Sequence, residues 1–511
     1  MDPLRRSPTY QPLAVSAGVH ATARHSPGKI ALRVVDATRS YGELSERAQR
    51  VTGAALAVPG VGKGARTAIL APNCIEYAEV VCGFADAGLI VATLNPRLTS
   101  RELEAQAADC DPQIIVVHPS LEQVVRDARL PNVQRVVVLG EEYESWLRDA
   151  SPAEACADLE ETDPFALVYT SGTTGLPKGV LLSHRSRALT FFGMAMEYGC
   201  FGPDDRHLSM APMAHGAGFA FTLAPMFFGG YVEVIPKFDP ELVLRKLAGG
   251  DFTGTFMVPT HFQTIFSLER TVLDRYRGPV PGLRAIISNA SALPQAIKER
   301  IVDYWGEGLL HETYGSTEGG VVTNLRPQDQ LRKIRCVGRP FACTDVRLLG
   351  ESGEEVGVGE VGELYSRSPY LFNGYFDRPD ETAATMCDGY VSVGDLARRD
   401  EDGYVYIVDR KKDMVISGGF NIYPREVEEV LHKHADVIEA AVIGVADERW
   451  GERLRAFVVV RSEEAATPAV LEQHCREYLS GYKVPREFRY VPALPRNAGG
   501  KILKNELRAL G

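Results

Sequence analysis

Hydrophobic and polar positions alternate over much of the chain in a pattern that predicts β-strands joined by helices. Residues 76–87 have the periodicity of an amphipathic helix. Apolar runs typical of buried strands lie at residues 66–70, 89–93, 113–118, 136–139, 251–258 and 283–288. Parallel strands crossed by helices produce this order, so we predict an α/β fold.

The pattern changes after residue 337. Short strands with glycine and acidic turns follow, at residues 345–349 and 360–367, and predict a small β-barrel or meander. A basic run at 410–412 precedes a compact α+β pattern in which Pro424 opens a helix. In that last part we expect helices at 424–434 and 469–479 and strands at 440–445 and 455–460. We place the boundary at Lys412, with domains of residues 1–411 and 412–511.

Length, charge and cysteine content exclude several classes of protein. A chain of 511 residues is expected to form more than one structural unit. The net charge of -11 argues against nonspecific nucleic-acid binding, which needs a basic face. No apolar run is long enough to span a membrane, and the N-terminus lacks the apolar core of a signal peptide. The nine cysteines form no Cys-x-x-Cys pair, which favours reduced thiols and a cytoplasmic protein.

Residues 169–180, Tyr-Thr-Ser-Gly-Thr-Thr-Gly-Leu-Pro-Lys-Gly-Val, are the most informative segment. Its hydroxyls and glycines can surround phosphate oxygens while Lys178 supplies a positive charge. Apolar runs at 165–169 and 179–182 flank it, which predicts strand, loop, strand rather than the strand-to-helix loop of P-loop NTPases. Glycine-rich hairpins are common, so this segment alone leaves phosphate binding and a plain hairpin equally open.

Three further segments carry groups suited to a nucleotide. Glu318 follows Tyr314 in a glycine-rich turn, where a carboxylate suits magnesium and an aromatic ring suits a base. Asp395 ends a predicted strand and can accept hydrogen bonds from both ribose hydroxyls, with Arg410 a short way behind it. The plain alternatives are a solvated glutamate, a turn cap and a surface ion pair.

Two basic residues, Lys501 and His215, are further candidates for contact with a ligand. Lys501 follows a glycine pair in a loop near the C-terminus, which suits a side chain that swings into a site. His215 lies among small residues and is the histidine best suited to touch a ligand. A solvated tail lysine and a buried core histidine are the alternatives.

Together and in this order, these segments resemble the acyl-adenylating (ANL) superfamily of acyl-CoA synthetases, luciferases and peptide-synthetase adenylation domains. The matching segments are residues 169–179, 314–318, 394–395, 409–424 and 495–501. The resemblance covers almost the whole chain and implies the acyl-CoA synthetase or ligase branch. It also implies the fold: a large N-terminal domain of two α/β subdomains plus a small β-barrel, and a mobile α+β C-terminal domain.

The resemblance assigns each segment a role in an ATP-dependent reaction that forms an acyl-adenylate and releases pyrophosphate. Tyr314 would pack on adenine, Thr317 would contact the α-phosphate, and Glu318 would bind magnesium. Asp395 and Arg410 would bind the ribose. The residues assigned to the β- and γ-phosphates are Thr170, Ser171, Gly172, Thr173, Thr174 and Lys178. The residues assigned to catalysis are Lys501, which would bridge the carboxylate and the α-phosphate, His215, Thr317 and Glu318.

The second half-reaction would transfer the acyl group to the thiol of coenzyme A. One site cannot serve both steps with Lys501 in place, so the C-terminal domain would turn about a hinge at Lys412. Gly418 and Gly419 match the loop that lines the thiol channel. The resemblance places the coenzyme A nucleotide at Trp450, Tyr482, Lys483 and Arg486.

The predicted acyl pocket departs from the family pattern at two places. Ala214 replaces the usual aromatic residue and enlarges the pocket, whereas Asn289 and Ala290 replace a glycine pair and narrow the wall near the adenylate. Small residues at 214 and 216–218 predict a roomy apolar cavity and therefore a bulky hydrophobic acid. No acidic residue at 215 holds an ammonium group, which disfavours α-amino acids. The pocket is assigned to Ala214, His215, Gly216, Asn289, Ala290, Gly315 and Ser316.

An acid–CoA ligase that uses ATP, Mg²⁺ and coenzyme A is the leading hypothesis. Because the wall near the adenylate is altered, a second hypothesis stays open: an enzyme that takes a preformed acyl-adenylate and forms only the thioester. A ligase that loads a carrier protein is the nearest rival. A luciferase-like oxidase is less favoured, as is a silent nucleotide-binding module, which needs no adenylation lysine. The acid and the oligomeric state, a homo-oligomer included, stay open.

Overall fold

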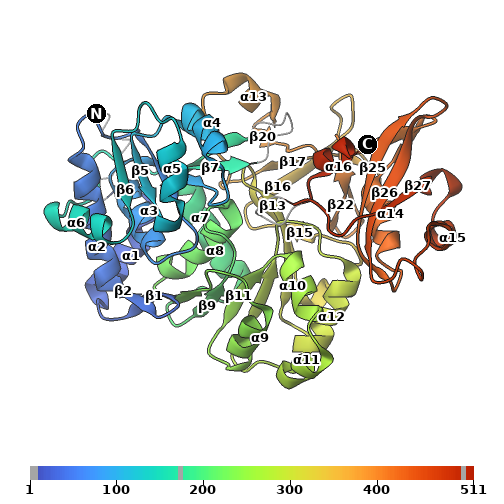
Figure 1. The fold of residues 1–511 in the computed structure, drawn as a ribbon, viewed down its shortest axis with the longest axis horizontal. Coiled ribbons are helices and arrows are strands. Elements are labelled where there is room, and N and C mark those ends of the chain that lie inside the picture. Colours follow the sequence, from blue (N-terminus) through green and yellow to red (C-terminus); the bar gives the residue numbers. More distant parts are fainter. Residues whose placement is uncertain (1–9, 171–176, 497–501, 511) are drawn as a thin grey trace.

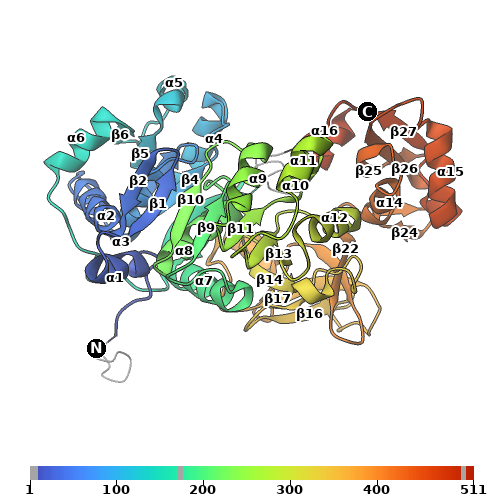
Figure 2. The ribbon, with the colours of Figure 1, turned by 90° about the horizontal axis from the view of Figure 1, so that it is seen from below.

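The computed structural model describes residues 10–170, 177–496 and 502–510, and within these ranges the chain forms four β-sheets (Figure 1). Two large sheets with helices make up the N-terminal part, a smaller antiparallel sheet follows, and the fourth sheet lies in a separate C-terminal lobe (Figure 2). This mixed architecture confirms the predicted fold class. Among the described residues, no helix combines the length and apolar character needed to cross a membrane.

The largest sheet has nine strands. Its six inner strands are parallel, and antiparallel strands close both edges. In spatial order the strands are β15 (Arg339–Pro340), β14 (Gly320–Leu325), β13 (Leu310–Ser316), β12 (Ala285–Ser288), β11 (Gly254–Met257), β9 (Arg206–Ser209), β10 (Tyr231–Val234), β1 (Ile30–Val34) and β2 (Ala37–Ser40).

The second sheet has seven strands, five of them parallel. Every residue of its inner strands β4 and β5 is buried, as expected for parallel strands covered on both faces. In spatial order the strands are β18 (Gly374–Tyr375), β8 (Lys178–Ser183), β7 (Pro164–Thr170), β4 (Ile90–Leu94), β3 (Arg66–Leu70), β5 (Ile114–Val117) and β6 (Arg135–Val138).

Helices pack on these sheets and are capped by their own sequences. Helix α2, for example, begins with a capping box in which Ser40 and Glu43 satisfy each other's backbone N–H groups. The N-terminal helices are α1 (Ala17–His25), α2 (Tyr41–Leu56), α3 (Glu76–Asp86), α4 (Ser100–Cys110), α5 (Glu122–Asp127), α6 (Glu141–Asp149), α7 (His184–Tyr198), α8 (Gly216–Phe227), α9 (Pro240–Ala248), α10 (Pro259–Phe266), α11 (Arg270–Tyr276), α12 (Gln295–Trp305) and α13 (Pro379–Ala384), with 3₁₀ turns η1 (Pro119–Leu121) and η2 (Pro327–Asp329).

The third sheet is antiparallel throughout and forms the small β unit predicted after residue 337. Its hairpin of β21 and β22 brings Asp395 opposite Arg410. The strands are β16 (Asp345–Leu349), β17 (Gly362–Arg367), β19 (Met386–Cys387), β20 (Tyr390–Val391), β21 (Asp395–Arg399) and β22 (Val405–Arg410).

The C-terminal lobe has its own sheet and its own buried apolar cluster, made only of residues from Val415 onward. The break between β22 and β23 contains Lys412, where we place the domain boundary. The elements are β23 (Val415–Ser417), β24 (Phe420–Ile422), α14 (Pro424–Leu431), β25 (Val437–Asp447), β26 (Gly451–Val460), α15 (Pro468–Tyr478), η3 (Gly481–Lys483), β27 (Glu487–Tyr490) and α16 (Lys504–Ala509).

Strand lengths in this lobe differ from the prediction. The strands expected at residues 440–445 and 455–460 are longer, because β25 and β26 pair from Asp447 opposite Gly451 outward to Val437 opposite Val460, with one register shift between Val437 and Glu439. Backbone pairing across a tight hairpin therefore extends the strands beyond the apolar runs that indicate them.

A buried polar network ties α1 to the second sheet's helices. Nε2 of His20 lies 2.7 Å from Oδ2 of Asp86 on α3, and Nδ1 lies 2.8 Å from the hydroxyl of Ser45 on α2. Burial acts to lower the pKa of His20, but the hydrogen bond to Asp86 and its negative charge outweigh burial, so the pKa is raised above 6.5.

We expect His20→Gln to reduce the free energy of unfolding at acidic pH and to have less effect at alkaline pH. A raised folded-state pKa means that protonated His20 stabilises the fold fully below about pH 6.5, and that this stabilisation is lost as the pH rises through the folded pKa. Urea unfolding of both proteins from pH 5.5 to 8.5 measures the difference. A difference that grows with pH would contradict this account.

Candidate active site

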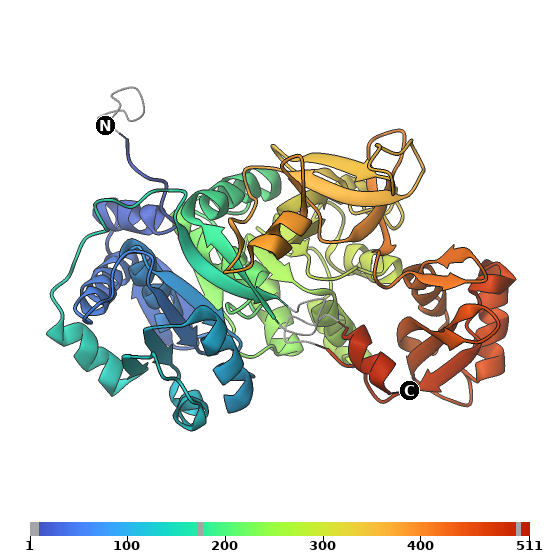
Figure 3. The same cartoon turned by 90° about the horizontal axis from the view of Figure 1, so that it is seen from above.

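A cavity of about 620 Å³ lies between the N-terminal part and the C-terminal lobe. Tyr314, Asp395 and Arg410 line it on one side. Glu429 of α14 and the segment from Ile502 into α16 line it on the other. Figure 3 shows α16, the last red helix, on the face of the lobe turned toward the rest of the molecule. Side chains from both parts of the chain therefore share one cavity.

Three predicted nucleotide-binding residues contact one another. The Tyr314 hydroxyl donates to Oδ2 of Asp395 at 2.6 Å, and Nε of Arg410 lies 3.0 Å from Oδ1. Burial raises the pKa of Tyr314, and the negative charge of Asp395 adds to this, so the phenol stays a donor. The sequence leaves a surface ion pair open as an alternative role for Arg410. Arg410 does form an ion pair, but with Asp395, and both side chains line the cavity.

Lys178, at the start of β8, is held by two groups that the sequence did not indicate. Its amine forms an ion pair with Glu381 of α13 and lies 4.9 Å from the centre of the Tyr375 ring. The hydrogen bond from Lys178 lowers the pKa of Glu381, so this carboxyl stays ionised. Thr170, at the end of β7, is the register partner of Lys178. The lysine therefore stands at the mouth of the β7 to β8 hairpin.

Part of the predicted phosphate loop and the predicted adenylation lysine lie outside the described residues. These are Ser171, Gly172, Thr173, Thr174 and Lys501. Both ends of the loop are placed by β7 and β8, and Ile502, the residue after Lys501, lines the cavity.

Glu318 is buried and is linked to Lys178 through Tyr375. The Tyr375 hydroxyl donates to Oε1 of Glu318 at 2.9 Å, while its ring faces the lysine amine. In the described ranges, no three His, Cys, Asp or Glu side chains group together as a metal site. Mg²⁺ binds one or two carboxylates and completes its shell with phosphates and water, so a lone glutamate fits that ion.

Asn289 and Ala290 line the cavity together with Gly315. The Asn289 amide donates to the Thr313 hydroxyl at 2.7 Å, and Ala290 has a left-handed φ of 78°. Left-handed backbone favours glycine, which accounts physically for the glycine usual at this place in the family. Ser316 does not line the cavity, and its hydroxyl accepts a hydrogen bond from Gly319 N at 2.8 Å.

A buried ion pair supports this wall from behind. Lys298 of α12 and Glu312 of β13 are 1% and 5% exposed and contact each other directly. Glu312 also accepts a hydrogen bond from the Leu293 backbone at 3.3 Å. The turn at residues 289–293 is therefore held to β13 at both ends.

The segment with Ala214, His215 and Gly216 does not line the cavity. Asn73 anchors the segment through hydrogen bonds to Ala211 O and Met213 N at 3.0 and 2.8 Å. The segment comes close to Thr317, a predicted catalytic residue, at Gly216, where an added Cβ would lie 3.4 Å from the Thr317 hydroxyl.

His215 is neutral and has an unused ring nitrogen. Burial lowers its pKa, and the nearby positive charge of Arg97 lowers it further. Its Nε2 is buried and has no hydrogen-bond partner among the described residues. Such a nitrogen is available to a ligand, in keeping with the predicted contact.

Gly218, one of the small residues from which a roomy cavity is predicted, is small for a different reason. At Gly218 an added Cβ would lie 2.1 Å from the carbonyl oxygen of Pro212. Close backbone approach, rather than open space, therefore requires glycine at this position.

The six residues assigned to coenzyme A gather around the hairpin of β23 and β24, away from the cavity lining. The Gly418 N–H donates to the Trp450 carbonyl at 2.8 Å, and Arg486 lies 5.5 Å from the Trp450 ring. Tyr482 packs on Phe420 at 4.9 Å between ring centres. Lys483 pairs with Glu426, and Gly419 lies beside Gly418 on the exposed turn.

Lys412 lines the cavity between the two parts of the chain. Partial burial lowers its pKa, and the positive charge of Arg410 lowers it further. The predicted hinge residue thus stands directly beside the predicted ribose site.

The comparisons with known proteins agree with this architecture. The AMP-binding enzyme family model matches residues 19–376, and the AMP-binding enzyme C-terminal domain model matches residues 426–501. Feruloyl-CoA synthase from an Amycolatopsis species is 36% identical over 491 residues, which cover 95% of this chain and 96% of that protein.

Two solved structures resemble the whole molecule. ATP-bound MatB from Rhodopseudomonas palustris has a TM-score of 0.89 and 30% identity, covering 98% of this chain and 99% of that one. The o-succinylbenzoate CoA synthetase MenE from Bacillus subtilis, in complex with its acyl-adenylate intermediate, has a TM-score of 0.86 and 28% identity, covering 98% of each chain. The chain therefore belongs to the AMP-binding enzyme family, in its acyl-CoA ligase branch, which confirms the resemblance that the motifs indicate.

Substitution at the exposed turn tests the packing of Trp450. An alanine Cβ at Gly418 would lie 2.8 Å from Cε3 of Trp450, whereas at Gly419 nothing lies within 4 Å. Both glycines have left-handed φ, which costs alanine about 1–2 kcal/mol. We expect Gly418→Ala to shift tryptophan emission and to lower the free energy of unfolding more than Gly419→Ala. Equal effects in fluorescence and urea unfolding would contradict the contact.

Proposed function

We propose that this cavity is where a bulky hydrophobic carboxylic acid is joined first to AMP and then to coenzyme A. The family and relatives define the reaction class: the enzyme is an ATP-dependent, AMP-forming acid–CoA ligase that uses ATP, Mg²⁺ and coenzyme A. The observation that carries the proposal is the shared lining, in which Tyr314, Asp395 and Arg410 face the segment that begins at Ile502.

The nucleotide would be held by its base and ribose at the end of β13 and at β21. Tyr314 offers a ring fixed through its hydroxyl. A carboxylate has about four acceptor positions, and the contacts from Tyr314 and Arg410 use two of those on Asp395. Asp395 therefore keeps acceptor capacity for two ribose hydroxyls.

The first half-reaction requires positive charge around the α-phosphate. The acid carboxylate attacks phosphorus, pyrophosphate leaves, and negative charge builds on the phosphoryl oxygens. Lys501 and Thr317 are assigned to the α-phosphate, and Lys178 is assigned to the β- and γ-phosphates. Glu318 would hold Mg²⁺, which supplies further positive charge to phosphate oxygens. Tyr375 would orient Glu318 through its hydroxyl.

The second half-reaction requires a different arrangement of the C-terminal lobe. Gly418 and Gly419, assigned to the thiol channel, are absent from the cavity lining. A turn of the lobe about Lys412 would bring their hairpin to the adenylate and withdraw Lys501.

A bulky hydrophobic acid fits the surroundings of the acyl group. His215 offers a neutral, uncharged ring rather than an acidic partner for an ammonium group. Asn289 and Ala290 add side chains where the family usually has glycine, so they narrow this part of the wall. One relative is named for feruloyl-CoA and one solved structure for o-succinylbenzoate, both with an aromatic ring, which favours the same class here, although another relative is named for sulfoacetate, a short polar acid.

Lys501→Ala separates the two half-reactions. We expect acyl-adenylate formation to fall by about a hundredfold or more, because a charge that stabilises the transition state is removed, while thioester formation from synthetic adenylate is kept. Pyrophosphate release without coenzyme A measures the first step, and mass spectrometry of the thioester measures the second. Lys411→Ala, at an exposed lysine paired with Glu363, is the control that keeps both. Equal loss of both steps in Lys501→Ala would refute the assigned role.

A panel of acids tests the substrate class. With ATP, Mg²⁺ and coenzyme A, we expect aromatic, fatty or polycyclic acids to exceed acetate in kcat/KM by about tenfold or more, because apolar contacts discriminate by that order. Higher values for short acids would refute the proposal. Pyrophosphate release from the best acid without coenzyme A distinguishes a complete ligase from a thioester-only enzyme. Free coenzyme A as acceptor distinguishes it from a carrier-protein ligase.

A further inference from the structure

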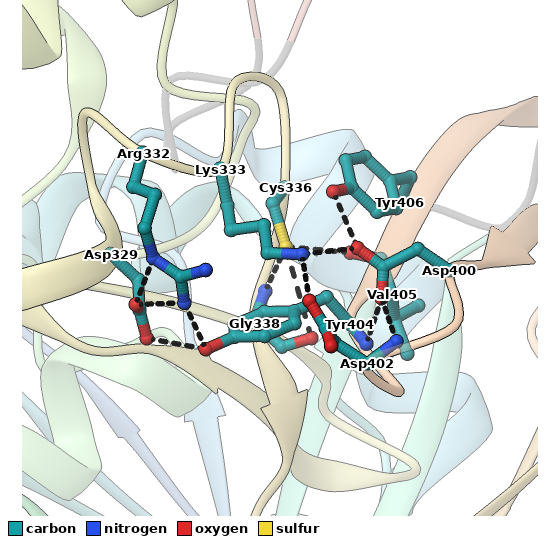
Figure 4. Close-up of polar contacts among 10 residues, drawn as sticks. All are labelled: Asp329, Arg332, Lys333, Cys336, Gly338, Asp400, Asp402, Tyr404, Val405 and Tyr406. Atoms are coloured by element: carbon teal, nitrogen blue, oxygen red, sulfur yellow. Dashed lines mark hydrogen bonds and ion pairs between the residues drawn. The ribbon is translucent and has the colours of Figure 1, made fainter.

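The loop at residues 329–338, here called the anchored loop, is fastened to the hairpin of β21 and β22 (Figure 4). The Lys333 amine lies 2.8 Å from Oδ2 of Asp400 and 2.7 Å from Oδ2 of Asp402. The Tyr406 hydroxyl donates to the same Asp400 oxygen at 2.9 Å. Two carboxylates from one tight turn therefore hold a single lysine.

Both ends of the anchored loop are also fixed. Near its start, Arg332 donates to Oδ1 of Asp329 at 2.6 Å and to the Tyr404 hydroxyl at 2.9 Å. Near its end, the Cys336 thiol donates to the Val405 carbonyl at 3.3 Å. All these partners belong to the N-terminal part, so the loop stays with that part when the C-terminal lobe moves.

Between these anchors the backbone adopts an unusual conformation. Arg335 has a left-handed φ of 63°, which residues with a side chain adopt only where their surroundings enforce it. Its guanidinium forms an ion pair with Oε2 of Glu429 on α14, across the domain boundary. Oε1 of the same glutamate lies 3.3 Å from Nε of Arg425, one helical turn away.

The ion pair between Arg335 and Glu429 joins the N-terminal part to the C-terminal lobe. Over residues 10–170, 177–496 and 502–510, it is the one ion pair that joins a residue before Lys412 to a residue after it. The hydrogen bonds across this boundary, from the Arg425 backbone to Asp409 at 2.9 Å and from the Asp413 and Met414 backbones to the Arg410 carbonyl at 2.9 and 3.1 Å, lie at or next to the linker. Arg335 and Glu429 both line the cavity, at its junction with the C-terminal lobe.

We propose that Arg335 is a positioning residue, whose ion pair with Glu429 holds the C-terminal lobe in the arrangement that forms the adenylate. The inference rests on the proposed function, because in this same arrangement the segment after Lys501 reaches the cavity. A turn about Lys412 carries α14 away from the anchored loop, so the pair stabilises one arrangement and not the other. A contact made in only one of two states shifts the population between them.

Charge reversal tests the proposal in the full-length enzyme. We expect Arg335→Glu and Glu429→Arg each to lower pyrophosphate release without coenzyme A by about three- to tenfold, since exposed ion pairs contribute modestly. Thioester formation from synthetic adenylate should stay level or rise. The double variant should recover most of the first activity, because it restores opposite charges. Arg335→Lys, which keeps the charge, should lose less than Arg335→Glu.

A second readout comes from ionic strength. Salt screens partly exposed ion pairs. The rate of adenylate formation divided by the rate of thioester formation should therefore fall with added NaCl in the wild type and change less in Arg335→Ala. Lys333→Ala should shift the ratio in the same direction as Arg335→Ala, because the loop loses its anchor. Arg476→Glu is the matched control, since Arg476 pairs with Glu472 inside the C-terminal lobe.

Several outcomes overturn the proposal. Equal loss of both half-reactions in Arg335→Glu would indicate structural damage instead of positioning, and so would failure of the double variant to recover. An unchanged ratio of adenylate formation to thioester formation in Arg335→Glu would show that the ion pair does not favour either arrangement of the domains. The Lys501→Ala result is independent: if that variant still forms adenylate, the proposed function fails whatever Arg335 does.

Discussion

The antiparallel pairing of β21 with β22 is the constraint on which the rest of the site depends. It sets Asp395 opposite Arg410, and Asp395 in turn holds the Tyr314 hydroxyl. The chain reaches Lys412 two residues after this hairpin ends, so the linker to the C-terminal lobe starts at the cavity wall. The turn of the same hairpin carries the carboxylates that hold Lys333. A single element thus connects the nucleotide wall, the linker and the anchored loop.

The charged groups in the N-terminal part of the site each contact a polar or charged partner within the protein. Glu318 accepts a hydrogen bond from Tyr375, Asp395 forms an ion pair with Arg410, and Lys178 forms one with Glu381. Burying an unpaired charge is expensive, so such contacts stabilise Asp395 and Arg410 in the cavity wall, and Glu318 and Lys178 outside it. These contacts also fix the side-chain rotamers, which prepares the site for a ligand.

Much of the architecture and the family could be predicted from the sequence, and the reasons are local. Apolar runs indicate strands such as β3, whose bounds agree with the prediction, and fixed spacing of glycines, hydroxyls and one lysine indicates the family. Contacts between distant segments leave no such pattern. Nothing near Tyr375 or Glu381 marks them as partners of Glu318 and Lys178, because the antiparallel pairing of β18 with β8 brings them there. The pair of Arg335 and Glu429 depends on how two domains meet, which no local pattern encodes.

Glu381 has a consequence for which anions can enter the mouth of the β7 to β8 hairpin. Because a carboxylate already neutralises Lys178, an incoming group must exchange with it. The organic acid that the enzyme consumes would replace one carboxylate by another and gain little. A polyphosphate carries more negative charge per group and can compete. If the triphosphate binds at Lys178, as we propose, the ion pair with Glu381 would favour it there over the organic acid.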